Sequence, residues 1–216
     1  MNFQDFLKYV PNIIPVELPA LSAHVKMAPK ERLEGLKNLD LEARNPRIAA
    51  VMMLLYPKNE ETHLVLIVRN AYNGVHSSQI AFPGGKYETS DVDFTETALR
   101  ETQEEVGVNR EQIEVIKHFT PMYIPPSNFL VHPFLGIAKE AVSFYPDVRE
   151  VASIIELPLS DFLNDEIIIE ATLSTSYGNN IVVPAFNIQN HVVWGATAMI
   201  LSELRDVLKA TFGLKA

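Results

Sequence analysis

Three glutamates, Glu101, Glu104 and Glu105, lie close together in the chain at spacings that suit metal binding. Residues three and four positions apart are neighbours on a helix, so on a helix these carboxylates would share one face. Like charges at such spacings destabilise a helix by roughly 0.2–0.5 kcal/mol per pair. A divalent cation would reverse this repulsion, and carboxylate oxygens suit Mg²⁺ or Mn²⁺. The spacing alone leaves open a simpler alternative, an acidic face exposed to solvent.

The residues around the glutamates predict the helix that would carry them. Asp93 is expected to cap its N-terminus, with Glu96 three residues later in a capping box. Gly107 followed by Val108 is typical of a helix C-terminus. A rotation of about 100° per residue assigns the core-facing stripe to Thr95, Ala98, Leu99, Thr102 and Val106. The glutamates fall on another face, near the C-terminus, where the helix dipole disfavours negative charge.

A family resemblance gives the acidic cluster a role. The segment 100–108 reads Arg-Glu-x-x-Glu-Glu-x-Gly-hydrophobic and follows the pair Gly84-Gly85, which resembles the Nudix box of pyrophosphohydrolases. The resemblance implies catalysis with Mg²⁺ or Mn²⁺, and it implies that Arg100 orients a box carboxylate. The implied metal ligands are Glu101, Glu104 and Glu105, with the carbonyl oxygen of Gly85 as a further candidate. The implied fold is of the α/β (α+β) class, an α/β/α sandwich with a mixed sheet.

The segment between Gly85 and Arg100 departs from the family pattern. The usual box places a glutamate six residues after the glycine and eight before the arginine. Here Asp91 lies six residues after Gly85 but nine before Arg100, so the loop carries one extra residue. Either Asp91 or Glu96 is therefore expected to pair with Arg100.

Segments outside the box narrow the resemblance to coenzyme A pyrophosphatases. They are 66–71 (LIVRNA), 76–86 (HSSQIAFPGGK), 123–127 (YIPPS), 183–186 (VPAF) and 194–198 (WGATA). The resemblance implies metal-dependent hydrolysis of the diphosphate of coenzyme A or acyl-CoA to 3′,5′-ADP and 4′-phosphopantetheine or its acyl derivative. Ser78 stands where the subfamily usually has a glycine, which leaves the substrate open.

Two alternative functions remain. The first keeps the chemistry and changes the substrate to ADP-ribose, a dinucleotide or a nucleotide sugar. The second is a binding or regulatory module of the Nudix fold without turnover. The intact glutamates argue against the second, because such a module need not retain metal ligands.

Further candidate residues lie outside the helix. Arg69 ends a predicted strand and could hold a phosphate bidentately, with a surface ion pair as the alternative. Glu150, like the box glutamates, is a candidate general base, with a surface acid in a loop as the alternative. His76 and Gln79 are candidate coenzyme A contacts, and Tyr123 is a candidate platform for adenine stacking. Their alternatives are exposed loop residues and ordinary packing.

Composition excludes several classes of protein. The 216 residues include 18 basic and 27 acidic side chains, giving a net charge of −9, and 47% are hydrophobic. Because no basic patch stands out, we expect no nucleic-acid partner, and the Nudix resemblance implies a small-molecule substrate. The absence of cysteine excludes disulfides, thiolate metal sites and cysteine nucleophiles. No signal peptide and no apolar run of about 18 residues is found, so we expect a cytoplasmic protein without a membrane span.

The sequence divides into an N-terminal extension, residues 1–47, and a Nudix hydrolase domain, residues 48–216. The extension has predicted helices near 3–10 and 30–38, and it is expected to pack on the domain or on a partner subunit; a homodimer is a family-level expectation. Apolar or alternating runs predict strands at 48–56, 64–69, 113–119, 129–138, 150–158, 167–173, 181–188 and 191–193. Pro133 suggests that 129–138 is an edge or bulged strand. A last helix is expected from 194 to about 208.

Overall fold

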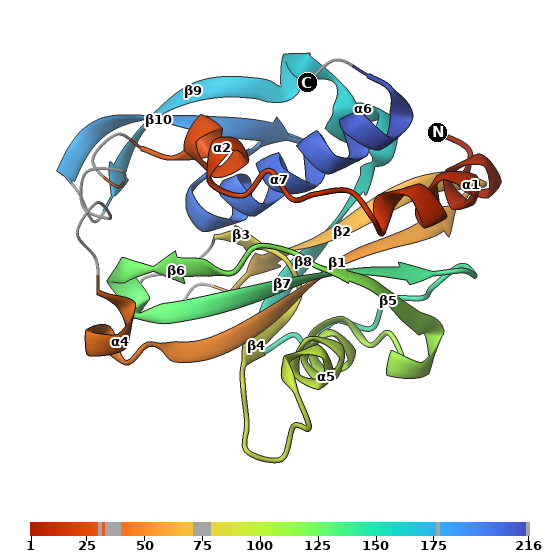
Figure 1. The fold of residues 1–216 in the computed structure, drawn as a ribbon, viewed down its shortest axis with the longest axis horizontal. Helices are drawn as coiled ribbons and strands as arrows, with labels where there is room; N and C mark the ends of the chain where they lie inside the picture. Colours follow the sequence, from red (N-terminus) through yellow and green to blue (C-terminus); the bar gives the residue numbers. More distant parts are fainter. Residues whose placement is uncertain (30–31, 33–39, 71–78, 176–177, 215–216) are drawn as a thin grey trace.

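A mixed β-sheet forms the middle layer of the protein (Figure 1). The computed structural model describes residues 1–29, 32, 40–70, 79–175 and 178–214, so His76 and nearly all of the predicted helix at 30–38 lie outside the described residues. Within these ranges the sheet has eight strands: β1 (Arg47–Lys58), β2 (Glu61–Arg69), β3 (Ile80–Ala81), β4 (Gly84–Lys86), β5 (Ile113–His118), β6 (Met122–Ile124), β7 (Phe129–Ala138) and β8 (Val151–Pro158). Neighbours run β3-β2-β1-β7-β5, with β4 beside β1, β6 beside β7 and β8 beside β2.

Helices and a second sheet complete the described part of the chain. The helical segments are α1 (Phe3–Ile13), α2 (Leu21–His24), η1 (Val25–Met27), α4 (Leu41–Arg44), α5 (Phe94–Val106), η2 (Arg110–Gln112), η3 (Pro125–Ser127), α6 (Leu159–Leu163), η4 (Asp165–Ile167) and α7 (Gly195–Phe212). The second sheet joins β9 (Ile168–Thr175), β10 (Gly178–Ile188) and β11 (His191–Val193) in the order β11-β10-β9. The predicted strands are therefore present, with ends shifted by a few residues. Helix α7 runs four residues beyond the predicted end and stops at Gly213.

Strand β1 is an interior strand because other strands pair with both of its edges. Its side chains are buried on both faces of the sheet. It runs parallel to β7 and antiparallel to β2 and β4. Successive side chains of a strand point to opposite faces. Met52 and Leu54 accordingly pack in the core shared with α5, and Met53 and Leu55 pack in the core shared with α7. Figure 1 shows these two helices on opposite sides of the sheet, which confirms the predicted sandwich.

Strand β7 is an interior strand, so the edge alternative of its prediction is wrong, whereas its pairing with β5 does carry an irregularity, opposite the step from Val115 to Lys117. One side of β7 pairs with β1. The other side pairs with β6 up to Val131 and with β5 from Phe134 onward. Pro133 falls at the changeover between these two partners, and its carbonyl accepts a hydrogen bond from Phe119 N–H at 2.8 Å. The proline is tolerated there because the missing N–H faces the gap between two paired segments.

Helix α1 packs on the rest of the molecule. Phe6 is fully buried, and its ring lies 6.5 Å from that of Phe212 in α7. The Phe3 N–H donates to the carbonyl of Glu60 at 2.8 Å, in the turn between β1 and β2. These contacts join the start of the chain to α7 and to the turn between β1 and β2. The domain boundary at residue 48 stays a prediction.

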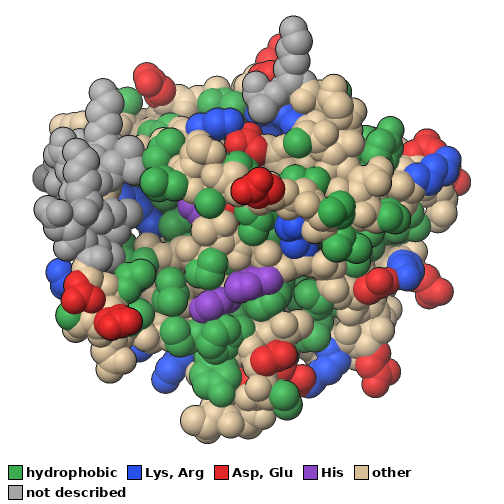
Figure 2. Space-filling model, viewed as in Figure 1, with side chains coloured by type: hydrophobic (Ala, Val, Ile, Leu, Met, Phe, Trp, Pro, Cys, Tyr) green, Lys and Arg blue, Asp and Glu red, His purple; other side chains and the backbone are tan. Residues whose placement is uncertain are grey.

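The face of the protein drawn in Figure 2 is mixed in charge. Figure 2 shows acidic and basic side chains interspersed among hydrophobic ones on the face toward the viewer. The coloured part of that face therefore has no basic patch of the kind that binds nucleic acid. Among the described residues, no helix has the length and apolar character needed to cross a bilayer.

Candidate active site

Helix α5 begins and ends where the sequence predicts. The Asp93 carboxylate accepts a hydrogen bond from the Glu96 N–H at 2.8 Å. Gly107 follows the last helical residue with a φ of +76°, a left-handed conformation that favours glycine. The side chain of Glu96 pairs with Arg110.

The buried side of α5 differs from the predicted stripe. Its buried residues are Thr97, Ala98, Thr102, Glu105 and Val106. Thr95 and Leu99, which the stripe included, are half-buried. Glu105 was expected beside the other glutamates on a polar face, but it points toward the start of β4. Glu105 can be buried there because its carboxylate accepts a hydrogen bond from the backbone N–H of Gly84 in β4.

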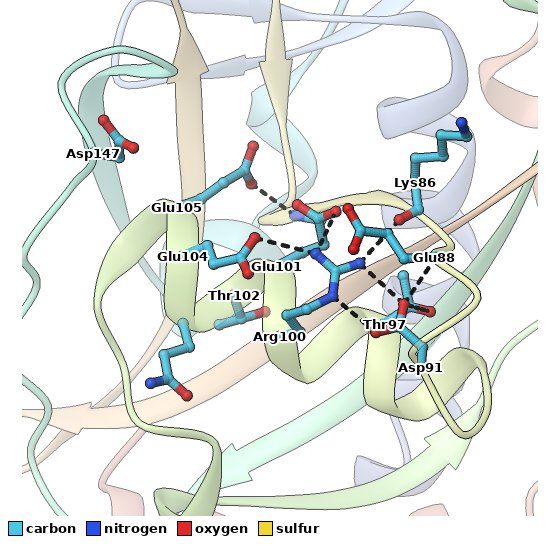
Figure 3. Close-up of polar contacts among 12 residues, drawn as sticks. Lys86, Glu88, Asp91, Thr97, Arg100, Glu101, Thr102, Glu104, Glu105 and Asp147 are labelled. Atoms are coloured by element: carbon cyan, nitrogen blue, oxygen red, sulfur yellow. Dashed lines mark hydrogen bonds and ion pairs between the residues drawn. The ribbon is translucent and has the colours of Figure 1, made fainter.

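Arg100 ties helix α5 to the preceding loop (Figure 3). Its Nε and Nη2 donate to the two carboxylate oxygens of Asp91 at 2.8 and 3.0 Å. Asp91 also accepts from the Thr97 hydroxyl at 2.9 Å, and its N–H donates to the Glu88 carbonyl at 3.0 Å. The bonds from Arg100 hold the pKa of Asp91 well below its usual range. Asp91 is therefore the partner of Arg100.

Glu105 is a carboxylate held inside the protein. Only 2% of its surface is exposed. Its Oε2 accepts from the Gly84 N–H at 2.8 Å, and its Oε1 lies 3.3 Å from Nη1 of Arg69. Burial nevertheless raises its pKa to about 7, because these partners offset only part of the lost hydration. A buried carboxylate whose lost hydration is only partly replaced by its partners, and whose pKa is therefore raised, is typical of a functional site.

Glu101 and Glu104 share one cationic group. Nη1 of Arg100 lies 3.1 Å from a carboxylate oxygen of each (Figure 3). Burial raises the pKa of Glu101, and the neighbouring charge of Glu104 adds to the effect. Glu101 also lies against the backbone of β4, where a Cβ on Gly85 would come within 2.5 Å of both carboxylate oxygens. A glycine at position 85 thus makes room for the Glu101 carboxylate.

A cavity of about 780 Å³ opens beside Glu101 and Glu104, which line it, whereas the buried Glu105 is not among its lining residues. Charged side chains come from α5, from β4 and the loop after it, from the end of β2 and from the residue before β8. The charged and polar residues of its wall include Arg69, Gln79, Lys86, Glu88, Arg100, Glu101, Glu104 and Glu150. The apolar part of its wall includes Val51, Ile124, Phe129, Val131, Ala196 and Ile200, from β1, β6, β7 and α7. A ligand in this cavity would meet charged groups and a hydrophobic surface together.

Several predicted site residues meet at this cavity. Arg69, Gln79 and Glu150 all line it. Nη2 of Arg69 lies 4.0 Å from a carboxylate oxygen of Glu150, whose side chain is 54% exposed. Tyr123 takes the packing role instead: it is buried, its hydroxyl donates to Asn128 at 2.9 Å, and it is not among the cavity-lining residues. Adenine stacking on Tyr123 thus gains no support from its position.

The lining residues that the sequence did not single out include Arg32, Lys86 and Trp194. Lys86 directly follows the glycine pair, and this position was the signal that could have found it. Trp194, at the start of the last helix, is half-buried and faces the cavity. Arg32 comes from the N-terminal extension, where no motif pointed to a site, and it donates to the Tyr123 carbonyl at 2.7 Å.

Comparison with known proteins identifies the family. The sequence matches the NUDIX domain over residues 46–168, more than half of the chain. The chain belongs to the Nudix family. The uncharacterized Nudix hydrolase NudL of Photorhabdus laumondii is 34% identical over 160 residues, which cover 74% of this chain and 84% of NudL. The peroxisomal coenzyme A diphosphatase NUDT7 of Mus musculus is 29% identical over 178 residues, which cover 76% of this chain and 75% of NUDT7.

A solved structure agrees with the Nudix fold. The Nudix hydrolase RenU of M. smegmatis has a TM-score of 0.54 to this chain at 17% identity, over 79% of this chain and 90% of RenU. At that identity the likeness supports the fold alone. The family and the fold expected from the sequence are therefore confirmed, and the chain is a Nudix hydrolase that acts on diphosphate bonds.

Nudix hydrolases generally need a divalent metal ion, and the residues present fit one. Within the described ranges, no three acidic or histidine side chains already converge as a metal-binding group. Glu101 and Glu104 nevertheless already share a cation, the guanidinium of Arg100. The hard oxygens of carboxylates and carbonyls are the ligands that Mg²⁺ and Mn²⁺ prefer. The groups that could hold the ion are the carboxylates of Glu101, Glu104 and Glu105 and the carbonyl of Gly85.

Proposed function

We propose that this Nudix hydrolase cleaves the diphosphate of coenzyme A or acyl-CoA, releasing 3′,5′-ADP and 4′-phosphopantetheine or its acyl derivative. The observation that carries the proposal is the composition of one cavity: box carboxylates and Arg69 share it with an apolar wall. Coenzyme A has the matching parts, because its diphosphate joins a charged nucleotide to a long, weakly polar arm. The similarity to the mouse coenzyme A diphosphatase over three quarters of both chains supports the same substrate.

The proposed reaction needs two things from the protein: groups that neutralise the charge of the diphosphate and a base that accepts a proton from water. Hydrolysis adds water across one P–O bond of the diphosphate and leaves two phosphate monoesters. A bound divalent ion would neutralise phosphate charge and lower the pKa of a bound water. Glu101, Glu104 and Glu105 would hold that ion, and Arg69 would hold a phosphate oxygen. Glu150, half exposed at the cavity, accepts the proton of the attacking water as general base.

A panel of substrates tests this proposal. The protein is incubated with Mg²⁺ or Mn²⁺ and, separately, with coenzyme A, an acyl-CoA, ADP-ribose and a dinucleotide, and products are resolved by chromatography. We expect the highest kcat/KM with coenzyme A or acyl-CoA, and 3′,5′-ADP as one product. Glu104→Gln in the same assay shows how much product comes from this site.

Each other outcome of the panel has a distinct meaning. A higher kcat/KM for ADP-ribose or the dinucleotide contradicts the coenzyme A proposal and supports the alternative substrate class. Binding without turnover of any substrate contradicts the enzyme and supports a binding module. The cytoplasmic location and the homodimer stay predictions.

A further inference from the structure

The loop that carries Glu150 is a short, closed turn. Asp147 accepts backbone hydrogen bonds at its carbonyl from Glu150 at 3.0 Å and Val151 at 2.9 Å. The Asp147 carboxylate accepts a further bond from the Arg149 N–H at 2.9 Å. The turn therefore has a defined shape of its own, and where it sits depends on its bonds to other elements.

Two elements hold this turn against the cavity. The Asp147 N–H donates to the carbonyl of Glu105 at 3.0 Å, which joins the turn to the end of α5. Figure 3 shows Asp147 on the far side of Glu105 from Arg100. At the end of β2, Asn70 supplies two more bonds: its N–H donates to the Glu150 carbonyl at 2.9 Å, and its Nδ2 donates to the Val148 carbonyl at 2.6 Å.

The side chain of Glu150 has little of its own to hold it. It is 54% exposed, and its carboxylate lies 4.0 Å from Arg69 Nη2, beyond hydrogen-bond distance. The position of its carboxylate therefore follows from the backbone of the turn. A displacement of about 1 Å in a reacting group can cost about 100-fold in rate, so the bonds that fix this backbone matter for catalysis.

We propose that Asn70 is a positioning residue for Glu150, acting through its side-chain bond to the Val148 carbonyl. Asn70 is not among the cavity-lining residues, so it acts without touching the substrate. The inference rests on the general-base role of Glu150 in the proposed function, but it does not depend on which diphosphate is cleaved. Replacing the amide removes one of the two bonds from β2 and lets the turn move away from the cavity.

A double-mutant cycle tests this role. The variants are Asn70→Ala, Glu150→Gln and both together, assayed with Mg²⁺ and whichever diphosphate the protein cleaves fastest. We expect Asn70→Ala to lower kcat about tenfold with KM changed less than twofold, because the missing bond misplaces the base and not the substrate. In the Glu150→Gln background the same change should lower kcat less than twofold, because there is no longer a base to position.

Controls separate positioning from folding. Asn70→Asp keeps the size of the side chain but lacks the donor, and it should behave as Asn70→Ala does. Asn164→Ala also removes an asparagine side chain that bonds the backbone, here by accepting from the Glu166 N–H, at a position outside the cavity wall, and it should leave kcat unchanged. Equal losses in both backgrounds, no loss in either, an unaffected Glu150→Gln, or a fall in Tm that accounts for the lost activity would each overturn the inference. A change of preferred substrate in the panel would overturn only the coenzyme A proposal.

Discussion

Glu105→Gln is expected to lower kcat by about 10³-fold while leaving Tm unchanged or slightly raised. Loss of a metal ligand removes several kcal/mol of transition-state stabilisation, and each 1.36 kcal/mol is a factor of ten in rate. The fold should survive, because the amide oxygen of glutamine can still accept the bond that Gly84 N–H now donates to Glu105. Burial raises the pKa of Glu105 to about 7, so a neutral side chain costs less to bury there. Steady-state kinetics and a thermal melt measure the two effects.

Glu96→Gln is the matched control for this prediction. Glu96 lies on the same helix, but its carboxylate pairs with Arg110 and is not part of the cavity wall. An exposed ion pair of this kind contributes little to stability, roughly 0–1 kcal/mol. We expect wild-type kinetics. If Glu105→Gln retains wild-type kcat, Glu105 is not a metal ligand.

Gly85→Ala is expected to reduce kcat/KM about 100-fold with a small loss of stability. The added Cβ would lie within 2.5 Å of both carboxylate oxygens of Glu101. Those atoms end a flexible side chain, so Glu101 can turn away at low cost to the fold while leaving its catalytic position. A misplacement of about 1 Å is enough for a rate loss of this size. The measurement is kcat/KM beside Tm for the variant and the wild type.

Gly84→Ala separates this local effect from damage to the fold. Gly84 has a φ of +153°, and an added Cβ would meet the carbonyl oxygen of Ala50 and lie 2.6 Å from the Cα of Val51. These atoms belong to the backbone of β1 and cannot move without disturbing the sheet. We therefore expect a clear fall in Tm for Gly84→Ala. A Gly85→Ala protein with wild-type kcat/KM would contradict the proposed place of Glu101 in the site.

Local patterns predicted the elements of this fold well. The apolar run of β1 and the Asp93 and Gly107 caps of α5 depend on neighbours in the sequence, and the structure places them as expected. The place of the strand that contains Pro133 could not be predicted from its sequence neighbours. Whether a proline strand is an edge depends on which strands lie beside it, and here two different strands meet at the residue that lacks an N–H.

The site was predicted in its residue types better than in its contacts. The structure brings Glu101, Glu104, Arg69 and Glu150 to one cavity, and their roles stay predictions. The burial of Glu105 was missed because a helical stripe assumes that acids face solvent, whereas a backbone N–H of β4 offers this acid a partner. The pairing of Asp91 with Arg100 was left open because only the path of the intervening loop decides it.

Binding of Mn²⁺ alone, measured by titration calorimetry, tests most directly whether the acidic end of α5 is a divalent-cation site. The wild type is compared with Glu101→Gln, Glu105→Gln and the control Glu96→Gln in the absence of substrate. We expect saturable binding to the wild type and the control, and at least tenfold weaker binding to the other two variants. Equal Mn²⁺ affinity in all four proteins would contradict the account, because the ion would then be held by other groups.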